Sequence, residues 1–201
     1  MSQRKALTSL AVAGATAYLV VAGQRLRTWG TRGDEATRSL SSEVLMPEPG
    51  AALTHAITID APPDQVWPWI AQLGQDQGGF YSYAWLENLS GAGIVNADHI
   101  EPAWQDPQPG GQLKLHPRVG LPIARVVPGE LLVIAKPVSF GVGFQWIFMV
   151  IPEGERQTRL LVRERYVVPW APARAVAAVV VCGSAVMSRK MLLGIRERAE
   201  R

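Results

Sequence analysis

Hydrophobic and polar residues alternate along residues 55–61, "HAITIDA", which is the period of a half-buried strand. The stretch that follows, "PPDQVWPWIAQLG", changes to the helical period. One face of the expected helix carries Val66, Ile70 and Leu73. Pro68 lies inside this pattern and removes a backbone hydrogen bond, so we expect the helix to begin late or to kink there.

Alternation returns in the second half of the chain, in stretches separated by Pro-Gly-Glu and Glu-Gly-Glu sequences at hairpin spacing. The expected strands are residues 112–116, 122–127, 131–136, 143–151 and 158–168. Residues 172–201 contain no internal proline, and an apolar residue recurs every four positions opposite charged side chains. We expect this last segment to form one long helix.

Residues 81–90 suit a short second helix, and residues 94–111 are rich in turn formers and predict an irregular crossing. The order of elements is therefore a strand, two short helices, antiparallel strands and a long C-terminal helix. This order predicts an α+β fold in which a curved antiparallel sheet wraps around the C-terminal helix. One helix cannot fill the concave side of such a sheet, so we expect a cavity between them.

The N-terminus has a different pattern, with 18 uncharged residues from Ala6 to Gly23 between basic flanks. A spanning helix needs about 20 mainly apolar residues, so residues 1–27 are interpreted as a membrane anchor. A cleaved signal peptide and a soluble N-terminal helix are the alternatives. Three arginines after the segment favour a cytoplasmic main domain over an exported one. Residues 28–54 have little periodicity and are interpreted as a linker, which leaves residues 55–201 as the folded domain.

Composition narrows the classes of function. The 201 residues are 48% hydrophobic, enough for one substantial core. The net charge is +3, but the arginines form no basic run between aromatic residues, so we expect no nucleic-acid partner. The single cysteine, Cys182, cannot form an internal disulfide or a metal cluster, and we expect it to be a small buried apolar residue.

Four stretches, in this order, resemble the SRPBCC superfamily of helix-grip proteins and a bacterial branch of it. They are "AITIDAPPDQVWPWIAQLGQDQGGFYSYAWLENL", "NADHIEPAWQD", "TRLLVRERY" and "RKMLLGIRERAE". The superfamily includes START lipid-transfer domains, pollen-allergen-like proteins and polyketide cyclases. The resemblance implies a hydrophobic pocket that holds a ligand or substrate between the sheet and the terminal helix. The run "AVAAVVVCGSAV", residues 175–186, departs from it by being apolar on every face, which leaves open whether it contacts lipid.

Candidate site residues follow from these patterns. In "TRLLVRERYVV" alternation places Glu164 on the apolar inward face, opposite three arginines. A buried carboxylate must be paired, reach water or bind a polar group of a ligand. In "GGFYSYAWLENLSG", helical spacing would place Tyr81 and Trp85 on one face and Phe80 and Tyr83 on another, so one pair should be core and the other should face the cavity mouth. The expected ligand-binding residues are Tyr81, Tyr83, Trp85, Trp104, Trp146, Phe148, Glu164, Tyr166, Met187 and Met191.

The three histidines have no metal-ligand spacing, so no metal and no cofactor are expected. His55 shares a strand face with two isoleucines and is the histidine that can enter the cavity. Asp98 and His99 are interpreted as turn formers rather than as a catalytic dyad.

These features lead us to expect a membrane-tethered protein that binds a small hydrophobic or lipid-like molecule, with Met187 and Met191 as an adaptable lid. One alternative is a cyclase- or dehydratase-like enzyme acting on a polyketide-like substrate, in which Glu164 or Asp98 moves protons. Another is an interaction module with a vestigial cavity. Of these, we favour binding without catalysis.

Overall fold

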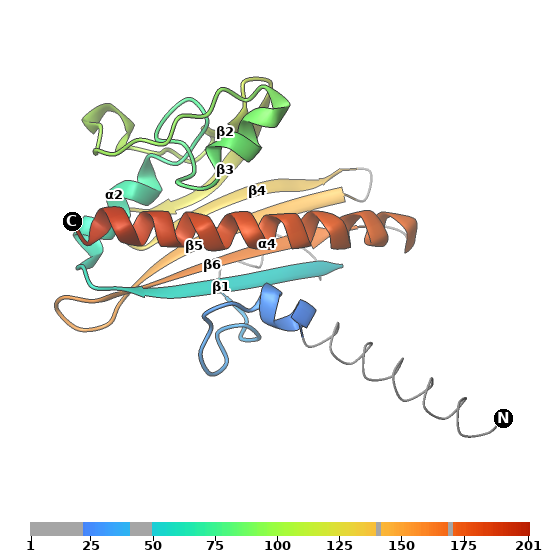
Figure 1. Ribbon diagram of the computed structural model, residues 1–201, viewed down its shortest axis with the longest axis horizontal. Coiled ribbons are helices and arrows are strands. Elements are labelled where there is room, and N and C mark those ends of the chain that lie inside the picture. The colour runs from blue at the N-terminus through green and yellow to red at the C-terminus, as the bar shows by residue number, and fades with distance from the viewer. Residues whose placement is uncertain (1–21, 41–49, 140–141, 169–170) are drawn as a thin grey trace.

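A computed structural model shows the chain as a curved sheet with one long helix lying across it (Figure 1). It describes residues 22–40, 50–139, 142–168 and 171–201. The expected membrane segment, Ala6 to Gly23, lies outside these residues except for its last two positions, which belong to a short helix at 22–27.

The sheet is antiparallel, and its strands are ordered β1-β6-β5-β4-β3-β2. Its strands are β1 (Ala51–Ile59), β2 (Gln112–His116), β3 (Val119–Val127), β4 (Leu131–Ser139), β5 (Val142–Pro152) and β6 (Thr158–Val167). Every strand expected from alternation is present. The first begins at Ala51 rather than at 55, because Ala51 pairs with Tyr166 and the long β6 provides partners for these extra residues.

The helices are α2 (Pro63–Ala71), α3 (Ala84–Glu87) and α4 (Ala171–Ala199), with 3-10 turns η2 (Asn88–Ser90) and η3 (Pro102–Trp104). Of the two alternatives expected at Pro68, a late start or a kink, the late start is wrong, because α2 begins at Pro63 and continues through Pro68. Pro62 and Pro63 lie at the start of the helix, where a backbone N–H has no intrahelical acceptor, and Pro68 lacks a single N–H and so removes only one intrahelical bond. The second helix begins only at Ala84.

The main hydrophobic core lies between α4, α2 and the inner face of the sheet. Ile59, Phe148 and Leu160 from the sheet meet Ile70 of α2 and Leu192 of α4, and all five side chains are buried. The C-terminal half of α4 is therefore fixed against the sheet. This arrangement confirms the α+β helix-grip architecture that the resemblance to the SRPBCC superfamily implies.

Residues 22–40 form a strap, called here the N-terminal strap, that crosses the edge of β1. Ala56 N donates to Trp29 O at 3.1 Å, so the strap pairs briefly with the edge strand. Gly30 follows with φ +75°, and a Cβ atom there would lie 2.0 Å from the carbonyl oxygen of Ala56. Only glycine permits this approach. The strap then reaches the outer face of the sheet, where Leu40 packs in a second apolar cluster.

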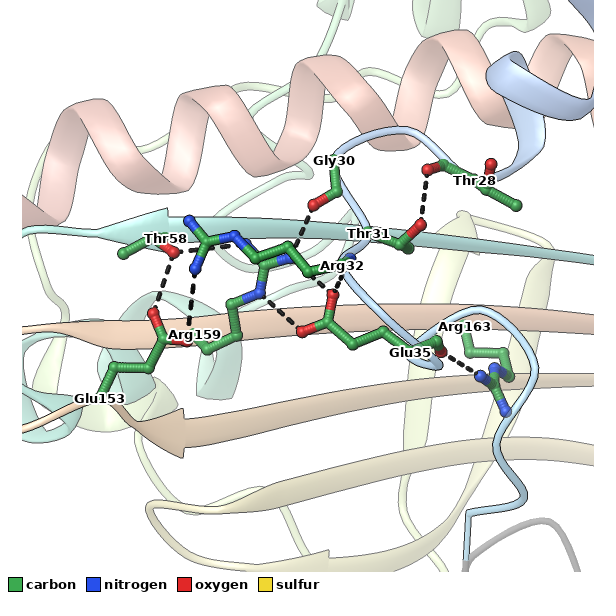
Figure 2. Close-up of polar contacts among 9 residues, drawn as sticks. All are labelled: Thr28, Gly30, Thr31, Arg32, Glu35, Thr58, Glu153, Arg159 and Arg163. Atoms are coloured by element: carbon green, nitrogen blue, oxygen red, sulfur yellow. Dashed lines mark hydrogen bonds and ion pairs between the residues drawn. The ribbon is translucent and has the colours of Figure 1, made fainter.

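Two arginines of β6 hold the strap on the outer face (Figure 2). Arg159 forms an ion pair with Glu35 at 2.6 Å and donates to Gly30 O at 2.6 Å. Arg163 donates to the carbonyl oxygens of Glu35 and Arg38 at 2.6 and 2.8 Å. Part of the segment interpreted as a linker is thus packed on the sheet. Most of these bonds use backbone carbonyls, which any residue provides, and so the sequence pattern carries little signal for them.

Candidate cavity between the sheet and the long helix

Two adjoining cavities lie between α4, the inner face of the sheet and the α3 region. Their volumes are about 250 Å³ and about 380 Å³. Leu115, Trp146 and Ser184 line both of them, so the two spaces meet at these side chains. The first is also lined by Phe80, Ser82, Glu87, Ser90, Ile94, Met187, Ser188 and Met191. The second is also lined by Leu121, Gly143, Phe144, Glu164, Tyr166, Val167, Val168 and Val180.

Aromatic rings fix the wall that the two cavities share. Trp146 of β5 stacks against Phe80 with ring centroids 6.1 Å apart and an interplanar angle of 29°, and packs against Phe148 at 4.8 Å. Phe144 lies 5.0 Å from Tyr166 on the neighbouring strand. Rings held on several sides lose little further freedom when a ligand arrives, so this wall is preorganised for an apolar molecule.

Glu164 carries the buried polar cluster of the second cavity. Its side chain points inward from β6 and is 1% exposed, as alternation predicted. Its carboxylate accepts hydrogen bonds from the hydroxyl groups of Tyr166, Ser184 and Ser188. The two serines are four residues apart, so one face of α4 presents both hydroxyls. Burial raises the pKa of Glu164 above its usual value, although the three donors oppose this shift.

Glu87 and Trp146 add two polar atoms without partners near the first cavity. Among the described residues, Glu87 Oε2 and Trp146 Nε1 are buried and have no hydrogen-bond partner. Burial raises the pKa of Glu87 to about 7, so its carboxyl group is partly protonated at neutral pH. Buried polar atoms are normally paired, and a ligand with a hydroxyl or carbonyl group can supply the missing partners.

Several of the expected ligand-binding residues lie at these cavities. Trp146, Met187 and Met191 line the first cavity, and Trp146, Glu164 and Tyr166 line the second. Phe148 is fully buried behind Trp146. Contact with a ligand stays a prediction for all of them.

The remaining expected residues lie elsewhere. Tyr81 is 1% exposed and packs against Trp69, with ring centroids 5.7 Å apart. In the described part of the chain, Tyr83, Trp85 and Trp104 line neither of the two cavities. Trp85 is 69% exposed.

The aromatic cluster divides differently from the expected helical pairs. Tyr81 has φ +53° and lies before α3, so helical spacing does not relate it to Trp85. Asn96 Oδ1 accepts from the backbone N–H groups of Phe80 and Tyr81 at 3.1 and 2.7 Å and holds the chain in this turn. Phe80 therefore faces the cavity and Tyr81 enters the core.

Sequence reasoning missed Glu87, Ser184 and Ser188. One signal was available for the serines: an inward carboxylate at 164 needs donors, and two hydroxyls at i and i+4 lie on the same helix as Met187 and Met191. Glu87 had no such signal, because its burial depends on how the short α3 packs.

The histidines contribute to structure in the described residues. His55 is buried, its Nε2 lies 2.7 Å from Leu26 O, and burial lowers its pKa. It contacts the N-terminal strap rather than either cavity, so the expectation that it enters the cavity is not met. His99 bonds Asp98 at 2.9 Å on the surface, and this bond lowers the pKa of Asp98. Within the described ranges, no group of three or more His, Cys, Asp or Glu residues is placed to hold a metal ion.

Helix α4 differs from expectation in its N-terminal half. Cys182 is exposed, not buried, because this half packs on the sheet along one side only. Residues Ala177–Ala199 are long enough to cross a membrane, and an 18-residue window within them has a mean hydropathy of 1.6, with 39% of that window buried in the protein. By itself this is weak evidence for membrane association.

Comparison with known proteins finds no matching family model and no matching curated protein. Among solved structures, norcoclaurine synthase from Thalictrum flavum, in complex with dopamine and hydroxybenzaldehyde, is similar at a TM-score of 0.45 and 13% identity, over 84% of this chain and 95% of that one. The Zhui aromatase/cyclase from a Streptomyces species is similar at 0.42 and 13%, over 75% and 94%. A protein from Thermobifida fusca is similar at 0.44 and 15%, over 74% and 92%. Similarities of this size do not transfer an activity.

Proposed function

We propose that the protein binds a small, mainly apolar molecule that carries one neutral hydrogen-bonding group. We further propose that residues 6–23 tether it to a membrane. The observation that supports binding most is the pair of adjoining cavities, which meet at Leu115, Trp146 and Ser184. Ligand sites are typically concave and mainly apolar, with a few convergent polar groups, and these cavities have that composition.

The polar groups indicate the charge of the ligand. Burial raises the pKa of both Glu87, to about 7, and Glu164, because desolvation makes a charged group costly at each position. An uncharged acid can donate to a carbonyl oxygen or accept from a hydroxyl group. A neutral amphipathic molecule therefore fits better than an anion.

One observation favours an enzyme as the second candidate. Glu164 is a buried carboxyl group at a cavity wall, and a raised pKa suits a general acid. Its oxygens already accept from three hydroxyls of the protein, which suits a structural role of the cluster better. Turnover of a polyketide-like substrate that is lost in Glu164→Gln is the result that would select this candidate.

Binding is tested on a chain without residues 2–21, called here the shortened chain. It keeps all residues whose contacts the structure describes, and it lacks the apolar segment that would itself bind a hydrophobic dye. Leu115→Trp adds volume where the two cavities meet and should weaken binding of the uncharged dye N-phenylnaphthylamine at least about tenfold, or ~1.4 kcal/mol. Leu89→Trp is the control, because Leu89 is 74% exposed and lines neither cavity. Equal affinities in both variants, with unchanged circular dichroism, would reject the cavity as the binding site.

Tethering is tested separately by flotation with phosphatidylcholine vesicles. The full chain should float with the vesicles, and a full-length variant with Leu10→Arg and Leu19→Arg should float much less, because charges in a spanning segment are costly. A full chain that stays in the aqueous fraction rejects the tether and leaves the binding proposal in place.

A further inference from the structure

The outward face of α4 changes character halfway along the helix. In the N-terminal half, Val179, Val180 and Val186 are 74%, 49% and 45% exposed. Residues 177–188 contain no charged side chain; Arg174 precedes this stretch in α4, and Arg189 and Lys190 follow it directly. Single exposed valines are ordinary, but an uncharged helical stretch with three of them is a typical interaction surface.

The apolar N-terminal sequence enters the structure beside this surface. Leu26 of the N-terminal strap packs with Val181 and Ala185 of α4. Figure 1 shows the short helix at 22–27 next to the start of β1, below the N-terminal half of α4. The uncharged segment of the sequence ends at Gly23, three residues before this contact.

The strap cannot move freely relative to α4. Arg159 and Arg163 bind it on the outer face of the sheet, through Glu35 and through backbone carbonyls (Figure 2). A membrane tether that ends at residue 23 would therefore be held beside Val181 and Ala185, the sequence neighbours of the exposed Val180 and Val186. A membrane reached through this tether lies next to the apolar half of α4.

The same part of α4 also forms the cavity wall. Val180 lines the second cavity while being half exposed, and Ser184 lines both cavities one turn later. Val167 and Val168, at the end of β6, complete this end of the cavity. Val180 thus reaches both the cavity and the surface, and only the helix itself separates Val179 and Val186 from the cavity.

We propose that the outward face of α4 from Val179 to Val186 docks on the surface of the lipid bilayer beside the tether, so that the second cavity receives its ligand from the membrane. The inference rests on the proposed function for its ligand and its tether. Arg189 and Lys190 follow the apolar stretch directly, as basic residues commonly do where a helix leaves the apolar layer for lipid headgroups. The surface that meets lipid is an in-plane apolar face, not a second span.

The single native cysteine allows this proposal to be tested by site-specific labelling. Cys182 is the only cysteine of the sequence and is exposed between Val179 and Val186. The full chain, reconstituted in phosphatidylcholine–phosphatidylglycerol vesicles, is labelled there with the environment-sensitive fluorophore NBD. The control is Cys182→Ser with Glu197→Cys, which moves the label to an exposed position of the same helix, about 22 Å further along it. Spin-labelled phospholipids then serve as quenchers that act only at lipid contact.

The proposal predicts that spin-labelled lipid quenches most of the emission at position 182 and little of it at 197. Unquenched, water-like emission at 182 overturns it. Blue-shifted but unquenched emission also overturns it, because the face is then covered by protein, either residues 6–21 of the same chain or a second copy. Flotation of the same sample shows whether the full chain is tethered to the vesicles at all. Dye binding by the shortened chain shows whether the cavity binds a ligand independently of the membrane.

Discussion

The two faces of strand β6 both bury charged side chains, but they surround them differently. On the outer face, Arg159 is bound by Glu35, by the carbonyl oxygen of Gly30 and by Thr58 Oγ1. On the inner face, Glu164 is bound by three hydroxyls and lies beside open space. In the part of the chain that the structure describes, Arg159 lines neither of the two inner cavities, and its pairing with the N-terminal strap fits a structural role. Pairing next to a cavity identifies the inner face as the candidate site.

The difference also concerns which part of the chain each face holds. The outer face binds the N-terminal strap, mostly through backbone groups, and so determines where a tether leaves the domain. The inner face meets α4 through side chains, including Ser184 and Ser188. Substitutions on the outer face should therefore change stability, and substitutions on the inner face should mainly change binding.

Arg159→Met is expected to have the largest effect. It leaves the carbonyl of Gly30 without this donor and the carboxylate of Glu35 with only the backbone N–H of Arg32, and loss of one member of a buried ion pair costs about 3 kcal/mol. Urea unfolding of the shortened chain measures this loss, with the exposed Arg156→Met as the control. Arg159 lowers the pKa of Glu35, so the difference from wild type should shrink as pH falls below about 4.5. Equal stability of the two variants would mean that the strap is not held by this pair.

Glu164→Gln is expected to have a smaller effect, seen on the inner face. The amide keeps the shape of the side chain and an oxygen that accepts hydrogen bonds, so affinity for N-phenylnaphthylamine should stay within about tenfold, or ~1.4 kcal/mol, of wild type. Fluorescence titration at constant pH measures it. A larger loss of affinity in a variant that still folds would show that the charge or proton of Glu164 takes part in binding.

Glu87→Gln is expected to have the smallest effect, which is limited to the pH dependence of stability and of dye binding. Burial raises the pKa of Glu87 from 4.5 to about 7. The contribution of the protonated side chain to the free energy of unfolding is therefore fully present below a pH of about 4.5 and is lost as the pH rises to about 7. Binding of a neutral dye should weaken over the upper part of this range, because the ionised carboxylate is more costly to desolvate. Dye affinity measured between a pH of about 4.5 and about 7 should not change with pH in Glu87→Gln. In the control Glu130→Gln it should change with pH as in the wild-type chain. If dye affinity still falls with rising pH in Glu87→Gln, another titratable group causes the pH dependence.

Much of the fold followed from periodicity, because strands and long helices repeat their environment along the chain. Alternation placed Glu164 inward, and helical spacing placed Met187 and Met191 toward the sheet. Features that depend on a single backbone angle did not follow. The positive φ of Tyr81 moves its ring out of the helical register.

Contacts made by the backbone or by small side chains also could not be predicted from the hydrophobic pattern of the sequence. The N-terminal strap is held through carbonyl oxygens, so its residues lack an apolar period. Of the serines that bind Glu164, Ser184 lies within the apolar run 175–186 and Ser188 lies two residues after it, where the hydrophobic pattern does not mark them as donors. Cys182 lies on the side of α4 that no other part of the described chain covers, which its own hydrophobicity does not reveal.

Native mass spectrometry of the shortened chain tests the central claim, that the cavities hold one small molecule, most directly. The wild-type chain is expected to carry one bound molecule, either retained through purification or N-phenylnaphthylamine added before buffer exchange. Leu89→Trp should keep this adduct and Leu115→Trp should lose it. A bare polypeptide mass for the wild-type chain, both before and after addition of the dye, would contradict the account and would favour a vestigial cavity.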